Sequence, residues 1–145
     1  MQNSINREIQ SWYESWYSID RYYAEWAQRK GLTDNSFYIL RTVFECSKPC
    51  TSHYLCEKLM LSKQTVSSAL DSLSAKGYLT RRTNPSDRRN RLIVLTETGE
   101  SFARQLWKEL HAAEQKAFAG MDESSRRGLI EGNRILAEQL RQSLS

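Results

Sequence analysis

The sequence predicts a mainly α-helical chain with one small β-hairpin. Apolar residues recur at helical spacing along most of the 145 residues, while glycine and proline are scarce, at six and two. Two short β-prone runs, separated by a turn motif, are the exception to this pattern. A chain of this length buries roughly two thirds of its unfolded surface, so we expect a single domain over residues 1–145.

The first predicted helix covers about residues 5–30 and carries a heptad stripe of apolar side chains on one face. The stripe consists of Ile5, Ile9, Trp12, Trp16, Ile19, Tyr23 and Trp26. Gly31 is expected to end this helix, because glycine tolerates the positive φ of the position after a helix. Thr33 is then the expected N-cap of a second helix that reaches about Glu45, and Pro49 interrupts the chain.

Two short helices are predicted next, joined by a tight turn. Thr51 is expected to cap the first of them, which turns four side chains inward: Tyr54, Leu55, Cys56 and Leu59. Ser62 is expected to cap the second, which runs from residue 63 to about 76 and ends at Gly77. Its inward face has the spacing i, i+3, i+4, i+7 and consists of Val66, Ala69, Leu70 and Leu73.

Residues 79–83 and 91–95 are predicted strands, and the Asn-Pro-Ser-Asp segment at 84–87 is a strong turn signal, so the two form a hairpin. Thr96 is expected to cap a long helix to about Ala119, and Asp122 to cap the last helix. The apolar residues of these two helices are Phe102, Leu106, Leu110 and Ala113, followed by Leu129, Ile130, Ile135, Leu136 and Leu140.

Two short helices joined by a tight turn and followed by a hairpin describe a winged helix-turn-helix, which we place at residues 33–96. The stripes of the first helix and the last two are longer than one small winged core can cover. We therefore expect residues 5–30 and 97–143 to be dimerisation helices in a two-fold homodimer.

The basic charge of the chain is concentrated in this winged segment. Residues 58–94 hold eight basic and two acidic residues, a net charge of +6, so the rest of the chain carries −2 of the total +4. A contiguous basic block of this kind is typical of a protein that binds a polyanion.

The helix after Ser62 is the candidate for entering the major groove of DNA, which admits a helix. Short hydroxyl-bearing side chains let the helix come close to the bases, and a glutamine can make a bidentate contact with adenine. The candidate contacts on this helix are Ser62, Lys63, Gln64, Thr65, Ser67 and Ser68. The same face also contains Asp71 and Ser72.

The hairpin supplies the other candidate DNA contacts, because arginines at a narrow protrusion suit the negative potential of the minor groove. They are Arg81, Arg82, Asp87, Arg88, Arg89 and Arg91. Asp87 cannot bind a phosphate, and we expect it to pair with Arg89 or to cap the turn.

These motifs together resemble the MarR family of bacterial transcriptional regulators. In that family an Asp-x-Arg wing tip leads through a strand to Leu-Thr-x-x-Gly at the start of a long helix, which is similar to residues 87–89 and 92–99 here. The segments 31–33, 62–67 and 73–79 are also similar to the family, and the resemblance covers essentially the whole chain.

The resemblance implies a homodimeric regulator, by default a repressor, that binds double-stranded DNA at a pseudo-palindromic operator. Members of the family tend to bind small aromatic effectors between the dimer helices and the winged unit. We therefore expect Trp16 and Tyr17 to line such an effector pocket.

Two other functions remain open at this point. The first is a winged-helix module that binds proteins and no DNA. The second is a redox-sensing regulator that uses Cys46, Cys50 or Cys56, although the sensor cysteine typical of the family's N-terminal helix is missing here. Cys56 is expected in the core, and Cys46 and Cys50 nearer the surface.

No metal site or cofactor is expected, since the histidines are His53 and His111 alone and no paired Cys-x-x-Cys occurs. His53 is expected on the exposed face of its helix, near DNA phosphates. No arrangement of nucleophile, base and phosphate cradle supports an enzyme. Without a signal peptide or a long apolar segment, the chain is expected to be soluble and cytoplasmic, with no membrane partner.

Overall fold

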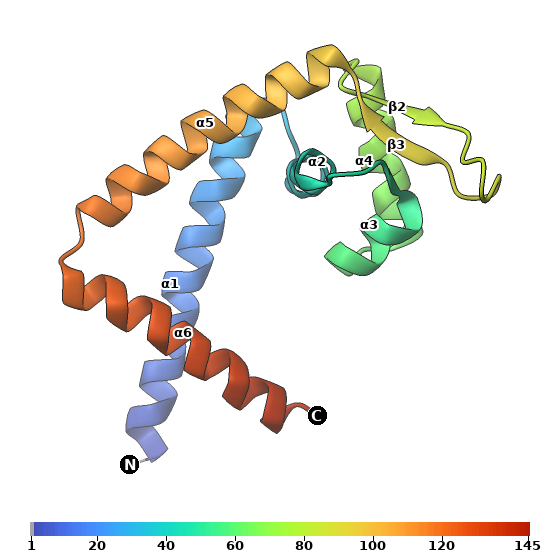
Figure 1. The fold of residues 1–145 in the computed structure, drawn as a ribbon. Coiled ribbons are helices and arrows are strands. Elements are labelled where there is room, and N and C mark those ends of the chain that lie inside the picture. The colour runs from blue at the N-terminus through green and yellow to red at the C-terminus, as the bar shows by residue number, and fades with distance from the viewer. Residues whose placement is uncertain (1) are drawn as a thin grey trace. The chain divides into compact units, whose positions relative to one another are not determined.

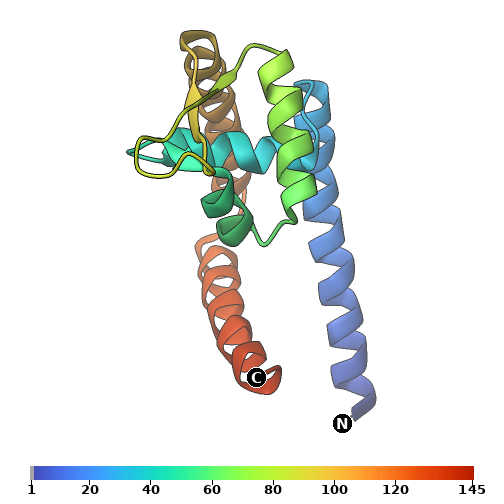
Figure 2. The ribbon, with the colours of Figure 1, turned by 90° about the vertical axis from the view of Figure 1, so that its right-hand side faces the viewer.

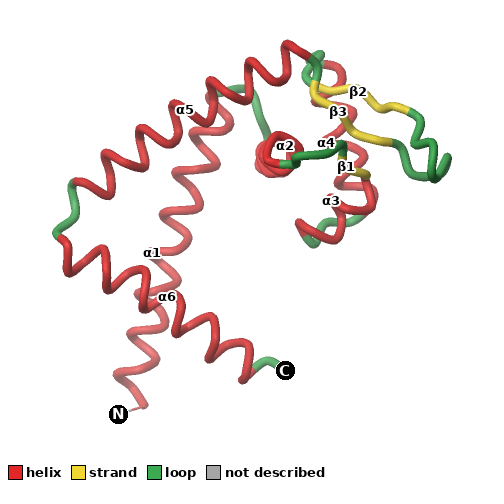
Figure 3. Tube along the Cα trace, viewed as in Figure 1, coloured by secondary structure: helices red, strands yellow, loops and turns green. Residues whose placement is uncertain are grey.

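The computed structural model describes residues 2–145, which form six α-helices and a three-stranded antiparallel sheet (Figures 1 and 3). The mainly helical fold class with a small β wing is therefore confirmed. Residues up to Ala103 form one compact unit, and Arg104–Ser145 form a second. The elements are α1 (Gln2–Arg29), α2 (Asp34–Glu45), β1 (Cys50–Thr51), α3 (Ser52–Leu59), α4 (Lys63–Ala75), β2 (Leu79–Arg82), β3 (Leu92–Leu95), α5 (Glu97–Ala119) and α6 (Glu123–Ser143).

The junction between α1 and α2 has the predicted local chemistry. Gly31 has a φ of 76°, and the amide of Leu32 donates to the Ala27 carbonyl at 3.0 Å, which closes the C-terminal turn of α1. The Thr33 hydroxyl then accepts a hydrogen bond from the Ser36 amide at 3.2 Å and begins α2.

The helix-turn-helix consists of α3 and α4, and both predicted N-caps are confirmed. The Thr51 hydroxyl accepts from the Tyr54 amide, and the Ser62 hydroxyl accepts from the Thr65 amide, each at 3.1 Å. Met60, with a φ of 54°, makes the sharp turn between the two helices. The predicted inward face of α4 is fully buried, against a core that includes Ile39, Leu40 and Leu55.

Two predictions about α3 and its approach are wrong. Tyr54 was expected inside, but its side chain is exposed, because α3 turns Leu55 into the core and leaves Leu59 half-buried. Cys50 was expected nearer the surface, but it is buried, whereas Cys56 is only half-buried. The reason is strand β1, which the sequence did not predict and which draws Cys50 into the sheet.

The sheet has the strand order β1-β3-β2, and the hairpin β2–β3 is the predicted wing. Leu79 pairs with Leu95 and Arg82 with Leu92, while Cys50 pairs with Ile93 on the other edge of β3. Figure 1 shows the hairpin loop projecting beyond α2, α3 and α4, and Figure 2 shows the same hairpin from the side to which it projects. Because strands alternate their side chains, Leu79 and Ile93 enter the core while Thr80 and Arg82 face solvent.

A compact joint connects the wing with the start of α5. The Thr96 hydroxyl caps α5 by accepting from the Gly99 amide at 2.9 Å, and it donates to the Gly77 carbonyl at 2.6 Å. The Thr96 amide donates to the Tyr78 carbonyl at 3.1 Å. The rings of Tyr78 and Phe102 stack at 4.3 Å with an angle of 6° between their planes. The end of α4 and the beginning of α5 are thus held together by both backbone and rings.

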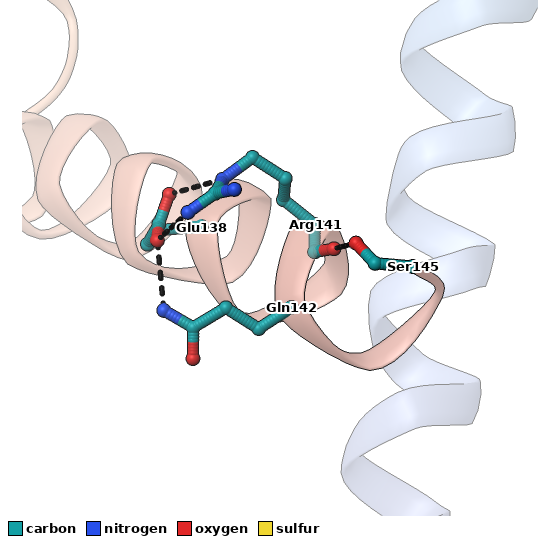
Figure 4. Close-up of polar contacts among 4 residues, drawn as sticks. All are labelled: Glu138, Arg141, Gln142 and Ser145. Carbon is teal, nitrogen blue, oxygen red and sulfur yellow. Dashed lines mark hydrogen bonds and ion pairs between the residues drawn. The ribbon is translucent and has the colours of Figure 1, made fainter.

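In the second unit, Asp122 caps α6 as predicted by accepting from the Ser125 amide at 2.9 Å. On the polar face of α6, Glu138 accepts hydrogen bonds from both Arg141 and Gln142 (Figure 4). The hydrogen bonds from Arg141, followed by that from Gln142, hold the pKa of the Glu138 carboxyl below its usual value. Leucine and isoleucine side chains of α6 remain exposed. Across residues 2–145, none of the helices is both long and apolar enough to cross a membrane.

Candidate nucleic-acid interface

The outward face of α4 is short and polar, as predicted. Lys63, Gln64, Ser67 and Ser68 are all exposed. Among the residues that the structure describes, Lys63 has no carboxylate partner, so its charge at the start of the helix is uncompensated. This face can come close to a polyanion and offer hydrogen bonds to it.

Ser62 and Thr65 have a different role from their neighbours on α4. The Ser62 oxygen accepts from the Thr65 amide and lies 2.8 Å from the Thr65 hydroxyl. The Ser62 hydroxyl therefore caps the N-terminus of α4, and the Thr65 hydroxyl is hydrogen-bonded to Ser62. They stabilise the start of α4, and a partner would meet hydroxyl groups that are already hydrogen-bonded.

Side chains of the loop itself shape the tip of the wing. The Asp87 carboxylate accepts from the Arg89 amide at 3.0 Å, and Asn84 accepts from the Ser86 amide at 3.0 Å. Asp87 therefore caps the turn through the backbone of Arg89, the second of its two expected roles. This leaves Arg88, Arg89 and Arg91 exposed, and within residues 2–145 none of the three pairs with a carboxylate.

The two arginines of β2 point to opposite sides. Arg82 is exposed, whereas Arg81 turns towards α4 and places Nη1 2.8 Å from Asp71 Oδ1. Arg81 Nη2 also donates to the Ser67 carbonyl at 3.3 Å. The structure thus brings Arg81 to the recognition helix, while Arg82 stays on the free face of the wing.

Helices α3 and α4 and the wing together enclose a cavity of about 420 Å³. It is lined by Ser52, His53, Cys56, Lys63, Ser67, Arg89 and Asn90. Two of the predicted contacts on α4 therefore lie beside one from the wing. The contributions of Ser52, Cys56 and Asn90 were missed, because only the packing of α3 against the wing reveals them.

His53 lies on the exposed face of α3, as expected, and its Nε2 is 3.4 Å from Glu57. Together with Lys63 and Arg89 it gives this cavity three basic side chains from three different elements. Such a cluster is suited to an anionic group such as a phosphate.

Cys50 is poorly suited to redox chemistry. Burial, followed by the neighbouring Cys46 thiol, raises the pKa of the Cys50 thiol to about 12. The thiolate is the reactive form, so this rise in pKa disfavours reaction at Cys50. Within the described part of the chain, no three His, Cys, Asp or Glu side chains gather closely enough to hold a metal ion.

Trp16 and Tyr17, the expected effector residues, both lie exposed on α1. Their rings stack at 5.6 Å, and Tyr17 also stacks on Tyr13 at 5.8 Å. The two side chains thus form part of an aromatic surface in the middle of the helix.

The sequence matches the MarR family model over residues 30–90, which include α2 to α4 and β2. YwhA, an uncharacterised HTH-type transcriptional regulator of Bacillus subtilis, is 29% identical over 92 residues. This match covers 56% of the chain and 66% of YwhA, so the chain spans just under two thirds of that relative.

Solved structures extend the likeness to nearly the whole chain. A MarR family regulator from Neisseria meningitidis has 28% identity and a TM-score of 0.73, with 95% of this chain and 96% of that one covered. FabT of Streptococcus pneumoniae, solved in complex with DNA, has 22% identity and a TM-score of 0.73, with both chains fully covered. The winged helix, the hairpin and the flanking helices have the fold of these solved structures, and residues 30–90 match the MarR family of transcriptional regulators.

Proposed function

We propose that the chain is a sequence-specific DNA-binding transcriptional regulator that acts as a homodimer on a pseudo-palindromic operator. The observation that carries this proposal is the cavity where Lys63, His53 and Arg89 converge from α4, α3 and the wing. Three such groups from separate elements fit a DNA phosphate beside a groove. The DNA complex of FabT, which shares this fold, supports the assignment.

In the proposed complex, α4 enters the major groove and the wing enters the adjacent minor groove. Gln64, Ser67 and Ser68 are the side chains of α4 placed to meet base edges or phosphates. Arg88, Arg89 and Arg91 bring positive charge to the minor groove or its rims. Arg82, on the free face of the wing, is assigned to the phosphate backbone. Ser62 and Thr65 position the helix start from which Lys63 extends.

The dimer is proposed because apolar side chains of α1 and of α6 remain uncovered in a single chain. A two-fold axis would place two copies of α4 about 34–36 Å apart, one turn of DNA. Repression is the proposed mode of action, in which the dimer occludes a promoter.

Replacing Arg89 by alanine is expected to weaken binding to all duplexes, and replacing Gln64 is expected to change preference at particular base pairs. Arg89 offers charge to the backbone or the minor groove, whereas Gln64 offers a bidentate amide. The measurement is fluorescence anisotropy on a labelled duplex selected from a random pool, with salt varied. For R89A, the slope of log K against log salt should fall by about 1.

The competing function is a winged-helix module that binds a protein. It predicts weak or absent binding to every duplex in the pool at low salt. A wild-type affinity that does not fall as salt rises would contradict the DNA-binding proposal, because phosphate contacts release counterions. Equal, sequence-independent losses for R89A and Q64A would contradict the roles given to these two residues.

We also propose that a small aromatic effector binds beside Trp16 and Tyr17 and releases the DNA. The supporting observation is the exposed aromatic surface of α1, whose stacked rings can hold a planar ligand. A panel of phenolic acids should contain compounds that raise the unfolding temperature and lower DNA affinity, and the double variant W16A/Y17A should lose both responses. Absence of both effects across the panel would contradict the proposal.

A further inference from the structure

An acidic side chain lies on the face of α4 that is proposed to meet DNA. Asp71 follows Gln64 and Ser68 along this face, and its side chain is 63% exposed. An unpaired carboxylate there would repel the phosphates, and an exposed helix position offers no packing reason for it. The carboxylate is paired, however, because Asp71 Oδ1 lies 2.8 Å from Arg81 Nη1.

The Arg81 side chain packs against α4 and does not extend into solvent. Its side chain is only 27% exposed, and Nη2 donates to the Ser67 carbonyl one helical turn before Asp71. Arg81 lies opposite Ile93, which is fully buried, so this side of the hairpin faces the helices. One guanidinium group thus joins β2 to two points on α4.

We propose that Arg81 and Asp71 are a positioning pair that fixes the wing against the recognition helix. Ser67, whose carbonyl Arg81 holds, lines the same cavity as Arg89 and Asn90 of the wing. The pair therefore sets the spacing between the α4 contacts and the wing contacts. In this proposal Arg81, a candidate DNA contact in the sequence analysis, acts through its contacts with α4. The effect of the pair on DNA affinity rests on the proposed DNA-binding function, whereas its role in holding the wing against α4 does not.

Two simpler roles predict different results. If Arg81 bound a phosphate, its loss would lower the salt slope by about 1. If Asp71 only repelled DNA, then D71N would raise affinity for every duplex. The positioning pair predicts that D71N lowers affinity for the selected duplex and leaves the salt slope unchanged, because no phosphate contact is lost.

The first test needs no DNA. Hydrogen exchange of the full chain, followed by mass spectrometry over residues 79–95, reports how firmly the hairpin is held. We expect D71N to speed exchange in this segment about threefold, D71E to restore it, and R82Q to leave it unchanged. R82Q is the matched control, since Arg82 is the next residue of β2 and faces away from α4. Equal exchange in D71N and wild type would overturn the proposal.

The second test measures DNA affinity for the selected duplex and for a scrambled duplex of the same length. D71N should bind the selected duplex about fivefold more weakly with an unchanged salt slope, and D71E should recover it. R82Q should lower both affinities and the slope. An unchanged unfolding temperature in D71N excludes a general loss of stability. A rise in the affinity of D71N would overturn the proposed positioning role. Failure of the wild type to bind any duplex would overturn the proposed DNA-binding function, and hydrogen exchange alone would then test the positioning role.

Discussion

Replacing Gly99 by alanine should destabilise the protein by about 3 kcal/mol, with a fall in unfolding temperature of roughly 10 °C. A Cβ at this position would overlap the carbonyl group of Tyr78. That carbonyl cannot retreat easily, because it accepts the Thr96 amide at 3.1 Å and the Tyr78 ring is stacked on Phe102. The added methyl group would therefore have to separate the end of α4 from the start of α5. Thermal unfolding followed by circular dichroism measures the effect.

Gly77 is the matched control, because it lies in the same connection between α4 and α5, but its backbone conformation, and not a close neighbour, favours glycine. Apart from its two chain neighbours, no heavy atom of residues 2–145 lies within 4 Å of the position of its Cβ, while its φ is 77°. G77A should therefore cost only about 1–2 kcal/mol, the strain of a left-handed residue. If G99A unfolds at the wild-type temperature, or costs less than G77A, the close approach of the two segments is not a determinant of stability.

The elements of this fold were predictable where the decisive interactions are local. Thr33, Ser62 and Asp122 each accept an amide hydrogen three residues ahead, and this chemistry is visible in the sequence. Strand β1 was not predictable, because two residues have no period and Cys50 pairs with the distant Ile93. The burial of Cys50 depends on that pairing, so it was missed as well.

In the candidate site, too, features set by neighbouring residues were predictable from the sequence, and features set by tertiary packing were not. A count of basic residues identifies the wing but assigns Arg81 and Arg82 the same role. The alternation of a strand separates them, since Arg81 shares its side with the buried Leu79. That signal was present in the sequence. The contribution of α3 to the cavity was not, because it depends on the folding that brings Ser52 and Asn90 to the same cavity.

Charged substitutions in the apolar stripe of α1 should convert the proposed homodimer into monomers. Ile9 and Ile19 are 48% and 51% exposed in the single chain, although isoleucine is among the residues most often buried. Burying each isoleucine at an interface contributes roughly 1.5–3 kcal/mol. The variant I9E/I19E changes four sites in a dimer and should raise its dissociation constant by about 10⁴-fold or more. Light scattering after size-exclusion chromatography measures the mass directly.

The control variant S11E/Q28E adds the same charge to α1 at two exposed positions. Each position follows a residue of the stripe by two residues and therefore lies on another side of the helix. It should remain dimeric. If I9E/I19E fails to fold, the wild type still tests the dimer, because the unfolding temperature of a dimer rises with protein concentration. A wild-type chain that is monomeric, with a concentration-independent unfolding temperature, would contradict the dimer. In that case the exposed isoleucines would need another partner, and the two α4 helices could not be held one DNA turn apart.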